Sequence, residues 1–328
     1  MAIATDIISD SIQQTKGIFF PINREFWLKI GLVSLLDHKG SSGFNYRATR
    51  MANPGEFTKF MTFIKTHLSL ILGISGGVVM LSWLFSIISY TFNFIFLESL
   101  FSRKVLIKTY FKKFIRKGLS LFWFNLILSA INLIIMVPLS LPLLIPLIRN
   151  WGNLSWSQFS IPYLIFFAII FVLDLIIFSL IDFVINNFVV MDMYTGSRSS
   201  FQSLRKMLKL IRIELLESFI YLLMKIILGI ATAIISLLIG LIIILASLVF
   251  GGIIALIFYL IYLGFPQTKI ILIVAGIAFA VILLLALAYA IAVILSPICG
   301  FYYIYSYNFF NKLKKRNKSF FKNEKTES

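Results

Sequence analysis

The sequence predicts an all-α polytopic membrane protein, in which a bundle of helices crosses the bilayer several times. Of its 328 residues, 60% are hydrophobic and 13% are charged, and the mean hydropathy is +0.97. Between Leu68 and Pro297 the chain consists mostly of long apolar stretches, and basic residues cluster in the few gaps. Helices that are apolar on every face are stable in lipid and not in water. We therefore expect a multi-pass protein of the cell membrane.

The first residues predict an amphipathic helix over 1–18. Ile3, Ile7, Ile8 and Ile12 recur at helical spacing among polar residues, so they form one apolar face. Such a helix lies on the membrane surface or packs against the bundle. The membrane domain is expected over 19–310, followed by a basic cytoplasmic tail over 311–328.

About six membrane segments are predicted within this domain. Five are long enough to cross, near 68–97, 118–148, 161–190, 219–263 and 270–297. The sixth, 26–36, covers only about half of the hydrocarbon thickness at 1.5 Å per residue, and a polar loop follows it over 37–60.

The apolar stretch 219–263 is too long for one crossing. A straight helix from Phe219 to Phe265 would measure roughly 70 Å, against about 30 Å for the hydrocarbon core. The stretch must therefore kink, fold back or extend past the membrane. Gly240, Gly251 and Gly252 are the candidate positions for a bend.

The charges predict the orientation. The formal net charge is +17, and basic residues gather at 103–117, 198–212 and in the tail, whereas the loops between the other span ends carry few charges. Cytoplasmic loops carry the excess of Lys and Arg, so all three clusters and the C-terminus are placed in the cytoplasm. The N-terminus is cytoplasmic if 26–36 is a sixth span. The charge is assigned to the membrane surface, and no nucleic acid is expected as a partner.

Three weak sequence matches indicate an internal repeat. Residues 93–98 match 187–192 and residues 111–116 match 204–209, while Phe26-Trp27 matches Phe122-Trp123. The matches occur in the same order, which favours three helical hairpins that each end in a basic segment. The competing explanation is coincidence in an apolar sequence of low complexity.

Several segments resemble a known family. They are FPINREFWLKIGL at 20–32 with the Gly/Ser/Asn loop after it, FNFIFLESL at 92–100, NNFVVMDMY at 186–194 and YLLMKIILGIA at 221–231. Their order resembles a family of uncharacterised archaeal multi-pass membrane proteins, and more distantly the membrane domain attached to some glycerophosphodiester phosphodiesterases. This sequence contains no soluble phosphodiesterase domain. The resemblance therefore implies fold and location and assigns no catalytic residue.

Two carboxylates inside a predicted span are the candidates for chemistry. Asp174 and Asp182 lie in 161–190, where a charge is costly and therefore needs a reason. One explanation is a proton or cation relay, or a substrate contact, in a transporter or channel. The other is a hydrogen-bonded pair within the bundle. The polar groups that would share such a cavity or bond are Asn125, Asn132 and Lys225. Lys225 alternatively extends its ammonium to the interface.

The leading functional hypothesis is a non-enzymatic membrane component that binds anionic lipid headgroups or a partner protein, which includes another copy of the chain. The residues expected at the headgroups are Lys104, Lys108, Lys112, Lys113, Arg116, Lys117, Arg205, Lys206 and Lys209. The alternative is a transporter or channel that uses Asp174. His38 and His67 are the only histidines and Cys299 is the only cysteine, without the spacing of a metal site or a nucleophile. We expect no catalytic residues, metal or cofactor.

Overall fold

A computed structural model describes residues 3–37, 66–149, 160–196, 198–264, 269–317 and 321, and its elements in these ranges are helices. The predicted all-α class is therefore confirmed. The chain divides into two compact units. Unit 1 comprises Met1–Ser42, Phe92–Lys112 and Leu208–Ser328, and unit 2 comprises Gly43–Thr91 and Lys113–Met207. Most of the predicted loop 37–60 and the end of the basic tail lie outside the described residues.

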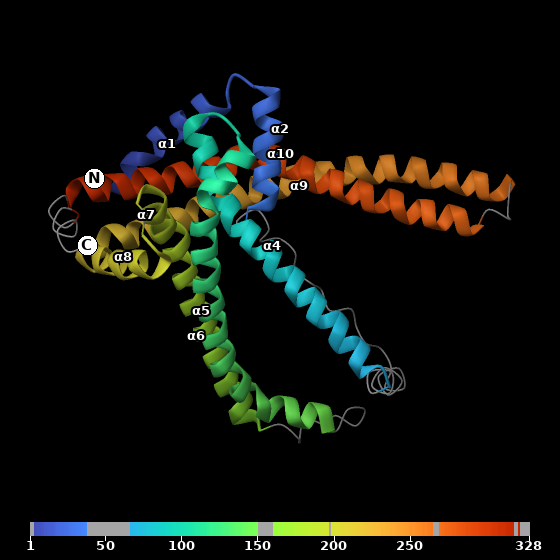
Figure 1. Cartoon of the computed structure of the whole chain (residues 1–328), viewed down its shortest axis with the longest axis horizontal. Coiled ribbons are helices and arrows are strands. Elements are labelled where there is room, and N and C mark those ends of the chain that lie inside the picture. The colour runs from blue at the N-terminus through green and yellow to red at the C-terminus, as the bar shows by residue number, and fades with distance from the viewer. Residues whose placement is uncertain are drawn as a thin grey trace. The chain divides into compact units, whose positions relative to one another are not determined.

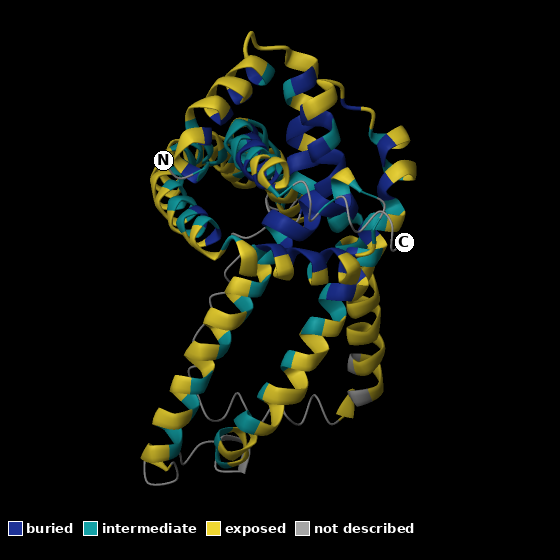
Figure 2. Cartoon of the chain, turned by 90° about the vertical axis from the view of Figure 1, so that its left-hand side faces the viewer, coloured by how far each residue is buried: buried dark blue, intermediate teal, exposed yellow. Residues whose placement is uncertain are grey.

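Five helical stretches in the described part of the chain are long and apolar enough to cross a membrane. They are α4 (Leu68–Ser102), α5 (Ile107–Arg149), α6 (Ile161–Val184) with its continuation to Thr195, α9 (Leu215–Gly264) and α10 (Lys269–Arg316) (Figure 1). Their most apolar parts are not buried inside the protein, and Figure 2 shows these helices exposed or half-buried along most of their length. Large apolar side chains that are exposed in this way require lipid around them. The chain is a multi-pass membrane protein.

In unit 1, two N-terminal helices pack against α10. The first, α1 (Ile3–Phe19), lies where the sequence predicts a helix over 1–18, and it buries Ala4, Ile7, Ser11, Thr15 and Phe19. The second, α2 (Arg24–Leu36), begins at Asn23, whose side chain accepts a hydrogen bond from the Phe26 amide. The Trp27 indole nitrogen donates to the Phe19 carbonyl and joins the two helices.

The short predicted segment 26–36 is thus part of α2, which runs along α10. A Cβ added at Gly31 would lie 2.3 Å from Val293 Cγ2, so the glycine permits this close approach. With 13 residues, α2 is about 20 Å long and shorter than the hydrocarbon core. Its crossing of the membrane stays a prediction, and so does its pairing with 68–97 as a hairpin.

The over-long apolar stretch forms one unbroken helix. α9 has 50 residues, about 75 Å, and passes through Gly240, Gly251 and Gly252 without ending. The structure therefore shows extension past one membrane thickness, and no break at the glycines. α10 has 48 residues and packs beside α9 as the second arm of a hairpin (Figure 1).

The core of unit 1 is rich in aromatic residues. The Tyr221 ring of α9 stacks on Phe309 at 4.1 Å and on Tyr305 at 5.2 Å between ring centroids. Phe96 of α4 contacts Tyr303 of α10 at 5.1 Å. This core holds one segment of the predicted repeat, 93–98.

In unit 2, α5 and α6 form a second hairpin. The Tyr163 hydroxyl donates to the Leu139 carbonyl, next to the positions where Pro138, Pro142 and Pro146 lie inside α5. Figure 1 shows that this end of α5 turns away from the rest of the helix, as expected where proline removes backbone donors.

α6 continues as a π-helical turn, η2 (Ile185–Val189), then as α7 (Val190–Thr195), and α8 (Ser200–Ile213) follows. π-turns are frequent at functional sites. Here the turn overlaps the start of the segment 187–192, which matches 93–98 in the predicted repeat. Asn93 and Asn187, the first residues of the two copies, are both buried.

Candidate functional site

The start of α5 presents one basic face. Within this continuous helix Lys108, Lys112, Lys113 and Arg116 are exposed, and their spacing places them on one side of the helix. Tyr110 and Phe114, on the other side, are 8% and 2% exposed. The start of α5 is therefore amphipathic, with its aromatic side packed inside the protein and its charges outward.

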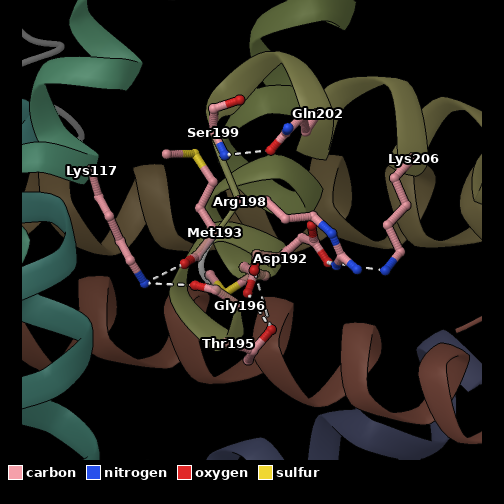
Figure 3. A network of polar contacts seen from close by, with 10 residues as sticks. Lys117, Asp192, Met193, Thr195, Gly196, Arg198, Ser199, Gln202 and Lys206 are labelled. Carbon is pink, nitrogen blue, oxygen red and sulfur yellow. Dashed lines mark hydrogen bonds and ion pairs between the residues drawn. The ribbon is translucent and has the colours of Figure 1, made fainter. Parts of the chain in front are cut away.

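Lys117, one turn further along α5, has a different role. Its ammonium donates to the carbonyl oxygens of Met193, Tyr194 and Gly196, the last at 2.8 Å (Figure 3). These carbonyls lie at the C-terminal end of α7, where the helix leaves acceptors without intrahelical partners and where a cation is favoured. Lys117 therefore caps α7 and is not exposed like its basic neighbours.

Asp192 of α7 is the centre of a second polar group. Its Oδ1 lies 3.5 Å from Arg198 Nη1 and 3.8 Å from Lys206 Nζ (Figure 3). The carboxylate and the Lys206 side chain are each 3% exposed. Arg198 lies between α7 and α8, and Lys206 lies within α8. The two ion pairs therefore stabilise the turn between these helices. The Lys206 ammonium therefore pairs with a buried carboxylate inside the protein.

The other basic residues of the predicted headgroup set are exposed. They are Lys104, Lys108, Lys112, Lys113, Arg116, Arg205 and Lys209. Seven of the nine side chains are thus exposed, while Lys117 and Lys206 bind groups of the protein.

The predicted carboxylate Asp174 is paired across the α5–α6 hairpin. The Asn132 amide nitrogen donates to both of its oxygens, at 2.9 and 3.0 Å. An amide that binds a carboxylate satisfies it without a second charge. Of the polar residues expected to share one cavity, these two are brought together.

The remaining candidates have other partners. Asp182 accepts a hydrogen bond from the Asn186 amide one turn later on the same side of the helix. Asn125 donates to the Leu121 carbonyl of its own helix. Lys225, in unit 1, donates to the Ser306 hydroxyl at 3.1 Å and lies over the rings of Tyr221 and Tyr302.

A comparison with family models shows which protein family contains this chain. A family of unknown function, DUF7544, matches residues 2–318. This chain belongs to the DUF7544 family. No curated protein and no solved structure matches it. Because the match covers almost the whole chain, the α5 face, the Asp192 group and the Asn132–Asp174 pair all lie within the matched residues.

Sequence reasoning missed one polar cluster of this DUF7544 member. The Tyr303 hydroxyl of α10 lies 2.6 Å from Asp37 Oδ2 and 2.8 Å from Asn93 Oδ1, and all three side chains are at most 2% exposed. Asp37 follows α2 directly and Asn93 lies within α4, so no spacing along the chain could associate them. The only signal was that Asn93 is a polar residue inside an aromatic run.

Within the described ranges, no group of three or more His, Cys, Asp or Glu side chains is close enough to hold a metal ion. His67 is exposed at the start of α4, and His38 lies outside the described residues. The candidate site residues described above are mainly cations, amides and carboxylates paired with them.

Proposed function

We propose that this chain is a non-enzymatic membrane component whose basic helices bind the anionic headgroups of the cytoplasmic leaflet. The observation that carries the proposal is the start of α5, where four cationic side chains are exposed on one face and aromatic side chains are buried on the other. Lys and Arg at the membrane surface snorkel, with the aliphatic stem in the apolar zone and the charge among the headgroups.

The energetic argument is electrostatic. A basic residue near an anionic leaflet contributes about 1 kcal/mol, and the contributions of a cluster accumulate. The proposal assigns this role to the seven exposed residues of the predicted set and leaves out Lys117 and Lys206, because their ammonium groups bind a helix end and a buried carboxylate.

The proposed topology places the basic helices and both termini in the cytoplasm, in accordance with the excess of Lys and Arg on that side. A partner protein or a second copy of the chain would meet the same surface. An archaeal source and a distant likeness to the membrane domain of phosphodiesterases stay predictions.

The transporter alternative has less support. Its central residue, Asp174, has both oxygens bound by Asn132. We therefore treat the Asn132–Asp174 pair as a clamp between two helices.

The test is preferential stabilisation by lipid. The full chain in mild detergent is heated with phosphatidylglycerol or with phosphatidylcholine, and the unfolding midpoint is followed. We expect the anionic lipid to raise the midpoint more for the wild type, because a ligand that binds the folded state stabilises it. A variant with Lys108, Lys112, Lys113 and Arg116 changed to Gln should lose the difference, while a variant with the three lysines changed to Arg should keep it. An unchanged preference in the Gln variant would contradict the proposal.

A further inference from the structure

Unit 1 contains a groove of about 330 Å³ that the proposed function does not use. It is lined by Gln14, Ile18, Leu100, Phe101, Arg103, Tyr307 and Asn308. These residues come from α1, from the end of α4 with the turn after it, and from α10. Its volume is at the lower end of the range for small-ligand sites.

Arg103 is held in position by its own turn. Its φ is 53°, in the left-handed region that residues other than glycine adopt uncommonly. The Ser102 hydroxyl accepts a hydrogen bond from the Lys104 amide at 3.3 Å and lies 2.9 Å from the Tyr110 hydroxyl, which fixes the turn against α5. The backbone that carries the guanidinium is therefore preorganised.

Within the part of the chain that the structure describes, the Arg103 guanidinium meets no acidic partner. None of the ion pairs between described residues involves Arg103. Its Nη2 approaches α1 at Gly17, where an added Cβ would lie 3.8 Å away. A guanidinium has five donors in a planar fork that matches the oxygens of a phosphate.

Two amides line the groove beside Arg103. The Asn308 side-chain nitrogen donates to the Ser11 hydroxyl at 3.0 Å and to Gln14 Oε1 at 3.1 Å. These two bonds use both protons of the Asn308 amide, so Gln14 is the amide whose own nitrogen is left to donate to a ligand. Donors without an intervening carboxylate favour an anion.

The rest of the groove is apolar. Ile18, Leu100 and Phe101 line it beside the polar groups, and the Phe101 ring contacts the Tyr307 ring at 4.3 Å between centroids. A soluble phosphate ester would leave these side chains unused. A phospholipid has a charged phosphate next to an apolar glycerol ester region, and it matches both parts.

We propose that this groove binds the phosphate and glycerol region of one anionic phospholipid, with Arg103 as its principal ligand. The inference deepens the proposed function and rests on it, because the groove ends at the turn that leads directly into the basic start of α5. The α5 face attracts anionic lipid in general, whereas the groove retains one molecule.

The experiment is native mass spectrometry of the full chain with phosphatidylglycerol or phosphatidylcholine. We expect one phosphatidylglycerol molecule to bind the wild type more tightly than any further lipid molecules do. Arg103→Gln should weaken this binding about tenfold, as expected when one charge-assisted contact worth about 1.4 kcal/mol is lost. The control Lys16→Gln removes an exposed charge of α1 outside the groove and should change the affinity less than about twofold. A second variant, Ile18→Trp, keeps every charge, fills the groove and should also abolish the tight site.

The outcomes separate the two proposals. Retention of the tight lipid by both groove variants would overturn the inference, even if the quadruple α5 variant loses its preference for anionic lipid. Loss of the tight lipid in both groove variants, with no effect of the α5 variant, would support the lipid site in the groove. It would contradict the proposal that the α5 face binds anionic lipid. Arg103-dependent displacement of the lipid by glycerol 3-phosphate at similar affinity would overturn the assignment to a membrane lipid.

Discussion

Lys206 Nζ lies 3.8 Å from Asp192 Oδ1, with both side chains almost completely buried. Lys206 is therefore a buried partner of Asp192, although the charge pattern of the sequence alone would place it at the lipid surface. Removing one partner of a buried pair leaves the other charge uncompensated. Because Arg198 also approaches Asp192, we expect Lys206→Met to lower the free energy of unfolding by about 3 kcal/mol, at the lower end for such pairs. Chemical denaturation in detergent measures the change.

Lys209, exposed on the same helix, is the matched control for this prediction. Lys209→Met should change the stability by less than about 0.5 kcal/mol, as surface substitutions do. The double variant Asp192→Asn with Lys206→Met should recover part of the loss, because neither buried charge of the pair then remains and Arg198 is partly exposed to solvent. Equal effects of Lys206→Met and Lys209→Met would contradict the ion pair.

Lys117 provides the second prediction. Its ammonium joins α5 to the carbonyl end of α7, so Lys117→Met leaves three acceptors without their cation. We expect a loss of about 2 kcal/mol, the size of hydrogen bonds to a charged group. Lys113→Met, which removes an exposed charge one turn earlier on α5, should have little effect on stability. A larger effect at Lys113 than at Lys117 would be inconsistent with the cap.

The pair of Asn132 and Asp174 gives the third prediction. Asn132→Leu removes the donor and leaves a carboxylate between two apolar helices, so we expect a loss of about 1–2 kcal/mol. Asp174→Asn keeps the hydrogen bond and removes the charge, and it should be close to neutral. Thermal unfolding of the two variants in one lipid distinguishes a clamp from a charge needed for transport. Retained stability in Asn132→Leu would argue against the clamp.

Ionic strength gives the fourth prediction. The Debye length falls from about 10 Å at 0.1 M salt to about 3 Å at 1 M. The general preference of the wild type for anionic lipid should therefore decline steeply over this range. The single lipid assigned to the groove should decline less, since apolar contacts with Ile18, Leu100 and Phe101 are not screened. Titration of lipid binding at the two salt concentrations measures both, and equal declines would contradict two separate sites.

The positions of the long helices could be predicted from the sequence, but the polar contacts between them could not. Apolar length identified each of the five spans because hydrocarbon thickness sets a minimum for a crossing. The glycines of α9 were candidate positions for a bend, with extension past the membrane as an alternative. A glycine lowers helix stability by only about 1 kcal/mol and need not interrupt a helix in lipid. Composition alone could not separate a break at these positions from a continuous 50-residue helix.

The contacts of the site depend on residues far apart in the chain. Asn132 and Asp174 were both singled out because they are polar inside apolar spans, and the hairpin joins them. By contrast, the bond between Tyr303 and Asp37 links residues 266 positions apart, which helix periodicity cannot reveal. Lys117 and Lys206 resemble the exposed lysines in sequence, and only packing against α7 and Asp192 distinguishes them.

The most direct test of the central claim is the lipid that accompanies the protein out of the membrane. The wild type and the variant with Lys108, Lys112, Lys113 and Arg116 changed to Gln would be extracted with their surrounding lipid in polymer nanodiscs. At about 1 kcal/mol per charge, four charges account for well over a tenfold preference at contact sites. We predict enrichment of anionic lipid around the wild type and its loss in the variant. Equal lipid compositions in the two samples would contradict the account.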